Sequence, residues 1–204
     1  MKIRGPLVTL GAVVAVGAGM WLVNVSQQNA TQPAAEPAAA PTSVSAAPKP
    51  TTPPAQQFPA KADYVGSVST NNGAITLDIT VDGDKAIAYA CDGNSVEVWL
   101  RGSAIDGAVR LASKDRTSSI DGRLRGSTVT GTLAIRGKSW QFNATEVRDP
   151  AGLYVEQSDA GRSSWIVDAD GSVTGVQRRT DGSTAPAPAL TSDATRVNGD
   201  TDVV

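Results

Sequence analysis

Residues 74–100, AITLDITVDGDKAIAYACDGNSVEVWL, contain three short runs of apolar residues at every second position, separated by two Asp-Gly turns. The first run places Ile75, Leu77, Ile79 and Val81 at alternate positions, between Thr76, Asp78 and Thr80. A period of two is typical of a strand with one buried face, and Asp-Gly between two such runs is a strong local signal for a hairpin. The stretch therefore predicts three consecutive antiparallel strands.

The same pattern continues on the C-terminal side of this stretch. Turns are predicted at Asp106-Gly107, Asp121-Gly122 and Arg136-Gly137-Lys138, between strands that carry Val109 with Leu111, Ile120 with Leu124, Leu133 with Ile135, and Trp140 with Phe142. A last hairpin is predicted over 164–176. No part of this region has a sustained period of 3.6 residues, so the fold class is all-β. The short turns predict an antiparallel meander that closes into a small barrel or folds into a two-sheet sandwich, and we favour the barrel.

Alternation also assigns side chains to faces. Val98 and Leu100 are expected to point inward, which leaves Trp99 pointing outward on the charged face of its strand. Cys91, the single cysteine of the chain, follows Ile87 and Tyr89 at alternate positions and is expected to be buried. The alternative is a reactive thiol, but the chain has no histidine to act as its base.

The N-terminal part predicts a membrane anchor. Residues 1–6 contain Lys2 and Arg4, and residues 7–25 carry no charge. A helix of this length spans roughly 28 Å, enough to cross a bilayer, and the preceding basic residues keep the N-terminus cytoplasmic. We therefore expect a single-pass signal anchor in the cell membrane with an extracytoplasmic C-terminal domain. The alternative is a secreted protein released by cleavage, for which the sites after the apolar run are weak.

A linker and a tail flank the predicted β-domain. Residues 26–62 are rich in Pro, Ala and Thr and predict a disordered, extended tether that could reach on the order of 100 Å. Residues 63–180 form the predicted all-β domain. Residues 181–204 predict a mostly irregular tail with a terminal hairpin around 197–200.

Composition excludes several kinds of site. The absence of histidine removes Ser/His and Cys/His triads and histidine metal sites, and one cysteine cannot form an intramolecular disulfide. A net charge of −2 does not favour nucleic acid as a partner. Residues 168–172 begin like a calcium loop but lack the distal acid, so they are interpreted as a hairpin turn. The sequence therefore predicts no catalytic residue, no cofactor and no metal.

Basic residues outnumber acidic ones between 110 and 138. The candidate envelope-binding side consists of Arg110, Arg116, Arg123, Arg125 and Arg136. Its expected partners are a cell-wall polymer, a lipid or an envelope protein, and the alternative is that these charges only protect strand edges. The preferred function is a membrane-tethered binding or scaffolding module of the cell envelope. Two alternatives remain: a carrier of a small apolar ligand inside the barrel, and a hydrolase that uses Asp92, Glu97 or Asp121 as general acid and base.

Four short motifs resemble those of exported or membrane-anchored actinobacterial proteins. They are Tyr-x-Cys-Asp-Gly at 89–93, Glu-x-Trp at 97–99, Gly-Leu-Tyr at 152–154, and the Trp-Ile-Val…Asp-Gly…Gly-Val hairpin at 165–176, followed by Ala-Pro-Ala-Pro at 185–188. The likeness covers about half of the chain. It implies an exported β-domain and supplies no catalytic residue.

Overall fold

The computed structural model describes residues 56–199 and 201. The predicted membrane helix and most of the predicted linker lie outside these residues. Within them, no helix is long and apolar enough to cross a membrane. The strands are β1 Lys61–Thr70, β2 Gly73–Asp82, β3 Lys85–Cys91, β4 Glu97–Ile105, β5 Ala108–Ala112, β6 Ser118–Arg125, β7 Thr128–Ile135, β8 Lys138–Val147, β9 Gly152–Ser158, β10 Gly161–Val167, β11 Val173–Arg179, β12 Thr184–Pro186 and β13 Thr195–Arg196.

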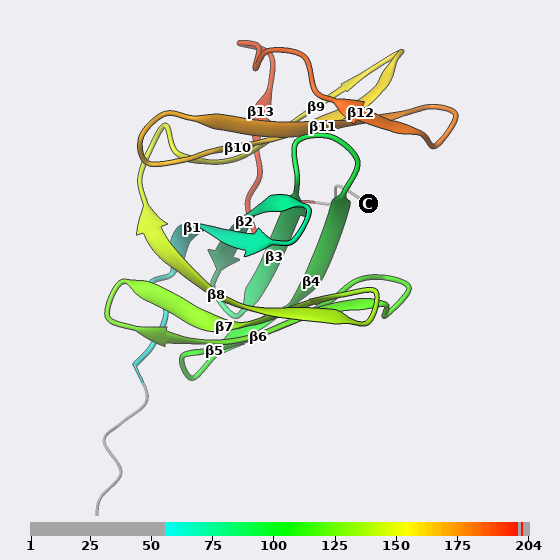
Figure 1. Cartoon of the computed structure of the whole chain (residues 1–204). Helices are drawn as coiled ribbons and strands as arrows, with labels where there is room; N and C mark the ends of the chain where they lie inside the picture. The colour runs from blue at the N-terminus through cyan, green and yellow to red at the C-terminus, as the bar shows by residue number, and fades with distance from the viewer. Residues whose placement is uncertain (1–55, 200, 202–204) are drawn as a thin grey trace, which may run out of the picture. The chain divides into compact units, whose positions relative to one another are not determined.

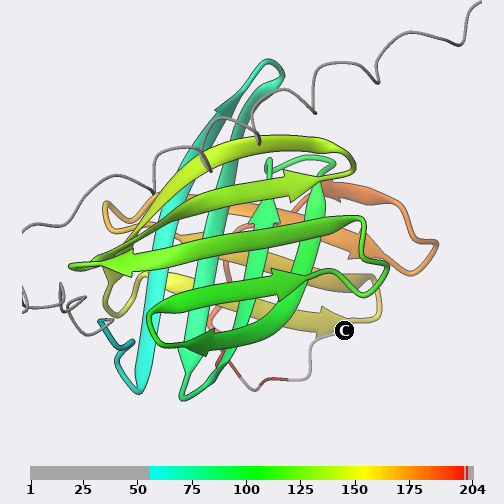
Figure 2. The same cartoon turned by 90° about the horizontal axis from the view of Figure 1, so that it is seen from below.

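Strands β1 to β8 form a closed antiparallel barrel in which each strand pairs with the next along the chain. β1 closes the barrel by pairing with β8, from Asp63 opposite Val147 to Gly66 opposite Ala144. Figure 2 shows β5–β8 crossing in front of β1–β4. The predicted barrel is therefore confirmed, and the sandwich alternative does not describe strands β1–β8.

Apolar side chains, most of them aliphatic, fill the interior of the barrel. They include Leu77, Ile79, Leu100, Val109, Ile120, Val129, Leu133 and Phe142, each at most 2% exposed. Ala88 and Ala90 of β3 and Tyr64 of β1 belong to the same cluster. An interior packed in this way argues against the carrier alternative, because an apolar ligand would have to displace core side chains.

A second sheet covers part of the outer wall of the barrel (Figure 1). Its strand order is β12-β11-β10-β9-β13. A second core lies between this sheet and the barrel, and it consists of Val65, Ile87, Tyr89, Cys91, Trp99, Leu153, Ile166, Val176 and Val197. Trp99 points away from the barrel interior as predicted, but it is only 8% exposed because the second sheet covers it. β3 is consequently buried on both faces.

One predicted turn is wrong. Asp121 and Gly122 lie inside β6, and the chain instead turns after Arg125, where Gly126 has a φ of 63°. Gly122 is needed for packing: a Cβ added there would lie 3.0 Å from a Val109 methyl carbon and 3.1 Å from one of Val129. The Asp-Gly pair alone does not distinguish a turn glycine from a glycine that makes room in a barrel.

This packing makes Gly122→Val a sensitive test of the barrel interior. We expect the substitution to lower the free energy of unfolding by about 1–3 kcal/mol, because the added methyl groups overfill the core. Ala112→Val is the matched control: Ala112 is exposed on the neighbouring β5, so its replacement should change stability by less than about 0.5 kcal/mol. Urea denaturation of both variants provides the measurement, and equal stabilities would show that Gly122 does not limit the packing.

The C-terminal residues take part in the fold. The tail predicted to be mostly irregular contributes β12, which pairs with β11, and β13, which pairs with β9. At the site of the predicted terminal hairpin, the Thr201 N–H donates to the Asn198 carbonyl and closes a turn. The tail therefore supplies both edge strands of the second sheet.

Candidate functional site

The short motifs of the sequence lie mostly where the second sheet meets the barrel. Their members Tyr89, Cys91, Trp99, Leu153, Ile166 and Val176 all belong to the second core. Trp165, on the other face of β10, pairs with Gly175, and its indole N–H donates to the Pro188 carbonyl over 2.8 Å. These motif residues therefore pack the second sheet against the barrel.

The Cys91 thiol is fully buried, which confirms the prediction. It donates to the Thr174 carbonyl over 3.9 Å. Burial raises the pKa of this thiol to about 12, so the nucleophilic thiolate is scarce at neutral pH. Cys91 is a packing group.

A buried ion-pair cluster joins the two layers near one end of the barrel. The Glu97 side chain, 1% exposed, accepts from Arg162 over 3.0 Å and from Arg178 over 2.8 Å. The Trp99 indole N–H donates to the same carboxylate over 3.2 Å, and the Arg162 guanidinium lies 5.1 Å from the centre of the Trp99 ring. We call these four residues the Glu97 latch. It connects β4 of the barrel with β10 and β11 of the sheet.

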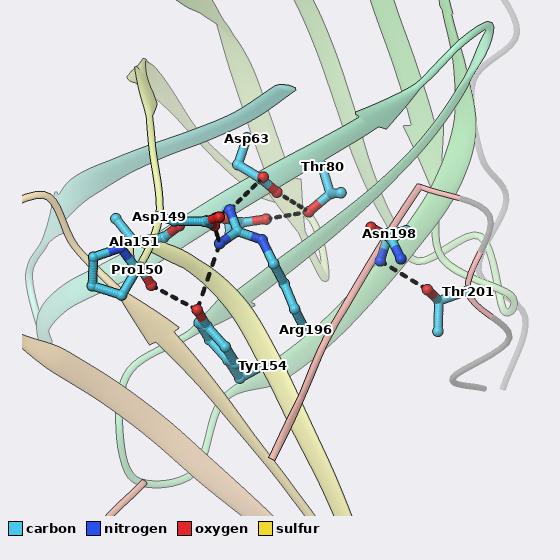
Figure 3. Close-up of polar contacts among 10 residues, drawn as sticks. Asp63, Thr80, Asp149, Pro150, Ala151, Tyr154, Arg196, Asn198 and Thr201 are labelled. Carbon is cyan, nitrogen blue, oxygen red and sulfur yellow. Dashed lines mark hydrogen bonds and ion pairs between the residues drawn. The ribbon is translucent and has the colours of Figure 1, made fainter. Parts of the chain in front are cut away.

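A second cluster connects the C-terminal strand to the barrel (Figure 3). Arg196 of β13 donates to Asp63 of β1 over 2.7 Å and to the Ala151 carbonyl over 2.8 Å. It also pairs with Asp149, and the Tyr154 hydroxyl beside it donates to the Pro150 carbonyl. Asp63 and Arg196 therefore hold the edge of the sheet against β1.

Next to this cluster, Asp78 of β2 is completely buried. The Thr80 hydroxyl lies 2.8 Å from Asp63 Oδ1 and 2.9 Å from Asp78 Oδ1, but it has one hydrogen and can donate to only one of them. Both contacts are satisfied if Thr80 donates to Asp63 and a protonated Asp78 donates to Thr80. Burial, with the Asp63 carboxylate as a second cause, raises the pKa of Asp78 well above its usual range, against the opposing effects of Thr80 and Arg196.

A cavity of about 670 Å³ opens at the end of the barrel where the β1–β2, β3–β4 and β7–β8 turns meet. We call it the end cavity. Ile75, Val96, Ile135 and Trp140 supply its apolar wall, and Val96 and Trp140 are only partly buried. Asn71, Asn72, Ser95, Ser139 and Thr184 supply amide and hydroxyl groups. The cavity has the size and the mixed lining of a ligand site.

Arg136 and Lys138 are the exposed cations of the end cavity. Neither forms an ion pair with another residue that the structure describes. Arg136 and Gly137 form a two-residue hairpin turn with φ angles of 47° and 81°. Asn, Asp or Gly is normally preferred in such a turn, so an arginine is held there in an unfavourable conformation.

A second hollow, of about 410 Å³, adjoins the end cavity. We call it the side hollow. Lys114 and Asp115 of the β5–β6 turn and Arg162 of the sheet line it, and it shares Glu97, Val98, Arg136 and Arg178 with the end cavity. Together the two hollows contain five cationic residues (Lys114, Arg136, Lys138, Arg162, Arg178) and three acidic ones (Asp92, Glu97, Asp115), a difference of +2.

The three acids are already engaged by the protein. Asp92 accepts from the backbone N–H groups of residues 94, 95 and 96, and these bonds outweigh partial burial and hold its pKa below the usual range. Glu97 belongs to its latch. Asp115 accepts from the Ser113 hydroxyl and from Thr117, which lowers its pKa. Arg162 and Arg178 also pair with Glu97, so the cations of the hollows without an ion pair among the described residues are Lys114, Arg136 and Lys138.

The structure separates the predicted basic side into different surfaces. Arg110, Arg123 and Arg125 line a third hollow of about 310 Å³ on the outer wall of β5–β7. Arg110 there lies 3.7 Å from Asp121. Arg136 lies in the end cavity, and Arg116, with a φ of 58°, lies in the β5–β6 turn. Of the end-cavity residues, the predicted basic side thus included Arg136; Lys138 was counted among the basic residues of 110–138 but not among the candidates, and Trp140 and the two asparagines were missed.

The carboxylates proposed for a hydrolase do not form an acid and base pair. Asp121 lies on the outer wall of β6, away from the end cavity that Asp92 and Glu97 line. A general acid at neutral pH needs a raised pKa, whereas hydrogen bonds lower that of Asp92. The Glu97 carboxylate is already bonded to Arg162 and Arg178 within the protein.

No family model, curated protein or solved structure matches the chain. Its function is therefore inferred from the residues themselves.

Proposed function

We propose that the chain is a membrane-tethered module that binds an anionic component of the cell envelope at the end cavity. The observation that carries this proposal is the pair of exposed cations Arg136 and Lys138, which have no ion-pair partner among the described residues and border a cavity of about 670 Å³. The predicted anchor over 7–25 and the predicted tether over 26–62 support the envelope as the location.

Charge complementarity decides the sign of the ligand. A cation would compete for carboxylates that the protein already uses. Asp92 accepts hydrogen bonds from its own turn, and Glu97 pairs with arginines. An anion would meet Arg136 and Lys138 at the rim, where no protein acid has to be displaced. Such exposed charges mainly increase the association rate and select the partner, and they are screened by salt.

The test is a double variant, Arg136→Asn with Lys138→Gln, in the full chain purified in a mild detergent. Asparagine suits the left-handed backbone of the turn, so the fold should be retained. We expect the affinity for an anionic probe, polygalacturonate, to fall by about tenfold or more at low salt. Isothermal titration calorimetry at two salt concentrations gives the affinity and its screening.

The matched control removes the same charge from the outer wall. Arg123→Gln with Arg125→Gln should leave the affinity within about twofold, because these residues line the third hollow and not the end cavity. If the control weakens binding as much as the end-cavity variant does, the binding surface is the outer wall and the proposal is wrong. It is also wrong if neither polygalacturonate nor polyphosphate binds the unmodified chain.

A further inference from the structure

The end cavity and the side hollow together are longer than a site for a single small anion would need to be. They share a wall formed by Val98, Arg136 and the Glu97–Arg178 pair, so they form one continuous depression across the end of the barrel. Cations occur along its length: Lys138 borders the end cavity, Lys114 borders the side hollow, and Arg136 lines both. A depression with spaced positive charges fits an extended ligand with spaced negative charges.

The depth of the end cavity limits what can enter it. Ile75 and Ile135, at its apolar wall, are 6% and 8% exposed, and the packed interior of the barrel lies behind them. An acyl chain would need that interior, which Leu77, Leu100 and Leu133 fill. The site is therefore suited to a ligand that lies across the end of the barrel and does not insert into it.

The polar lining matches hydroxyl groups. The side chains of Asn71, Asn72 and Ser139 make no hydrogen bond with another described residue. Amides and hydroxyls both donate and accept, which suits a ligand that carries hydroxyls, whereas a bare polyphosphate presents mainly acceptors. Trp140 adds a partly exposed aromatic side chain whose indole N–H has no partner among the described residues. A flat apolar ring with a polar edge suits a sugar ring with its apolar face and hydroxyl rim.

We infer that the ligand is a linear anionic saccharide, with Trp140 and the two asparagines contacting sugar rings in the end cavity while Arg136, Lys138 and Lys114 meet successive acidic groups. This inference rests on the proposed function and names the chemical class of its ligand. No covalent step is involved.

The test compares four probes on the full chain in detergent by calorimetry: galacturonate, an oligogalacturonate of about six units, a neutral oligosaccharide of the same length, and polyphosphate of similar charge. We expect the oligogalacturonate to bind on the order of tenfold more tightly than each of the others, because it alone combines several rings with several charges. The indole N–H signals of the tryptophans, assigned with Trp140→Phe, should show a shift of Trp140 with this probe and not with polyphosphate.

Two variants keep the test independent of folding effects at Trp140. The double variant Asn71→Ala with Asn72→Ala changes two exposed turn residues. It should lower the affinity for oligogalacturonate by about threefold or more and leave the affinity for polyphosphate unchanged. Lys138→Gln should lower the affinity for both anionic probes. If polyphosphate binds as tightly as oligogalacturonate and leaves the Trp140 signal unmoved, the saccharide inference fails while the proposed anion site stands.

An anionic lysolipid provides a further outcome. If it displaces oligogalacturonate and shifts the indole N–H signal of Trp140 more than oligogalacturonate does, the ligand is an amphiphile and the inference is wrong. Absence of binding by every anionic probe would instead remove the proposed function together with the inference.

Discussion

Glu97→Ala is expected to lower the free energy of unfolding by about 2–4 kcal/mol, because it removes the shared partner of two arginines and a tryptophan. The Glu97 side chain is 1% exposed, so its carboxylate is bonded by protein alone. Arg162 and Arg178 are 19% and 40% exposed and can recover part of their hydration, which places the cost below that of a fully buried pair. Urea denaturation of the full chain, followed by tryptophan fluorescence, measures the loss.

Two further variants give this result its meaning. Glu97→Gln keeps an acceptor for the Trp99 indole and should lose less stability than the alanine variant. Asp121→Ala breaks the exposed Arg110–Asp121 pair, in which both side chains are 73% exposed, and should change stability by less than about 0.5 kcal/mol. Equal effects of Glu97→Ala and Asp121→Ala would mean that the buried latch contributes no more than a surface pair.

Hydrogen exchange locates the effect of the same variant. Because the latch joins β4 to β10 and β11, Glu97→Ala should reduce amide protection in the second sheet more than in β5–β8. A uniform loss of protection would show that the sheet and the barrel unfold together even without the latch.

The barrel could be predicted because its signals are local. Each strand from β1 to β8 pairs with its neighbour in the chain, and turns such as Arg136-Gly137 lie between runs of alternating side chains. Period and turn chemistry are readable over a few residues. The prediction of a turn at Asp121-Gly122 was wrong for the same reason, since the neighbours Val109 and Val129 that require a glycine come from other strands.

The second core could not be predicted, because it depends on contacts between distant segments. Alternation in β3 gives a face with Ile87, Tyr89 and Cys91 and a face with alanines, and a single barrel buries only one of them. The structure buries both, since Ala88 and Ala90 face the barrel core while the larger residues meet the sheet. Glu97 and Arg162 are separated by 65 positions, and no local pattern pairs them.

The end cavity itself was not predicted, for a similar reason, and only Arg136 of its lining belonged to the candidate envelope-binding side. The excess of basic residues drew attention to Arg136, but the residues that join it come from the turns after β1 and β3 and from the start of β8. Alternate hairpins of a closed meander lie at the same end, so the topology could have grouped these turns. The usable signal in the sequence was Arg136, an arginine at a turn position where asparagine is normally preferred.

Asp78→Asn is expected to stabilise the protein at pH 7 by more than about 1 kcal/mol, because each pH unit between the unfolded and the raised folded pKa of Asp78 costs about 1.4 kcal/mol. Asp78 is fully buried, one of its oxygens has no hydrogen-bond partner, and the other faces the Thr80 hydroxyl. The asparagine amide can donate to Thr80 as a protonated Asp78 would, and Thr80 can still donate to Asp63. Asparagine thus reproduces the hydrogen bond of protonated Asp78 to Thr80, and its amide does not ionise at pH 7.

The gain should depend on pH in a defined direction. Burial and the Asp63 carboxylate raise the pKa of Asp78 in the folded protein above the value of about 3.9 that it has in an unfolded chain. Below about pH 4 both states hold the proton, so the aspartate adds no penalty. As the pH rises above this value, only the folded state retains the proton, and stability is lost by about 1.4 kcal/mol per pH unit up to the folded pKa. The difference in melting temperature between Asp78→Asn and the unmodified chain should therefore be small at pH 4 and grow towards pH 7.

Thr80→Val separates this explanation from simple repacking. The substitution keeps the shape of the side chain but removes the hydroxyl between the two carboxyl groups, so both lose a bond and stability should fall by about 1–3 kcal/mol. In the Asp78→Asn background the same change should cost a similar amount, because the amide then loses its acceptor. If Asp78→Asn lowers stability at pH 7, or gains equally at pH 4 and pH 7, the folded protein holds Asp78 as a carboxylate, and Thr80 must donate to it in preference to Asp63.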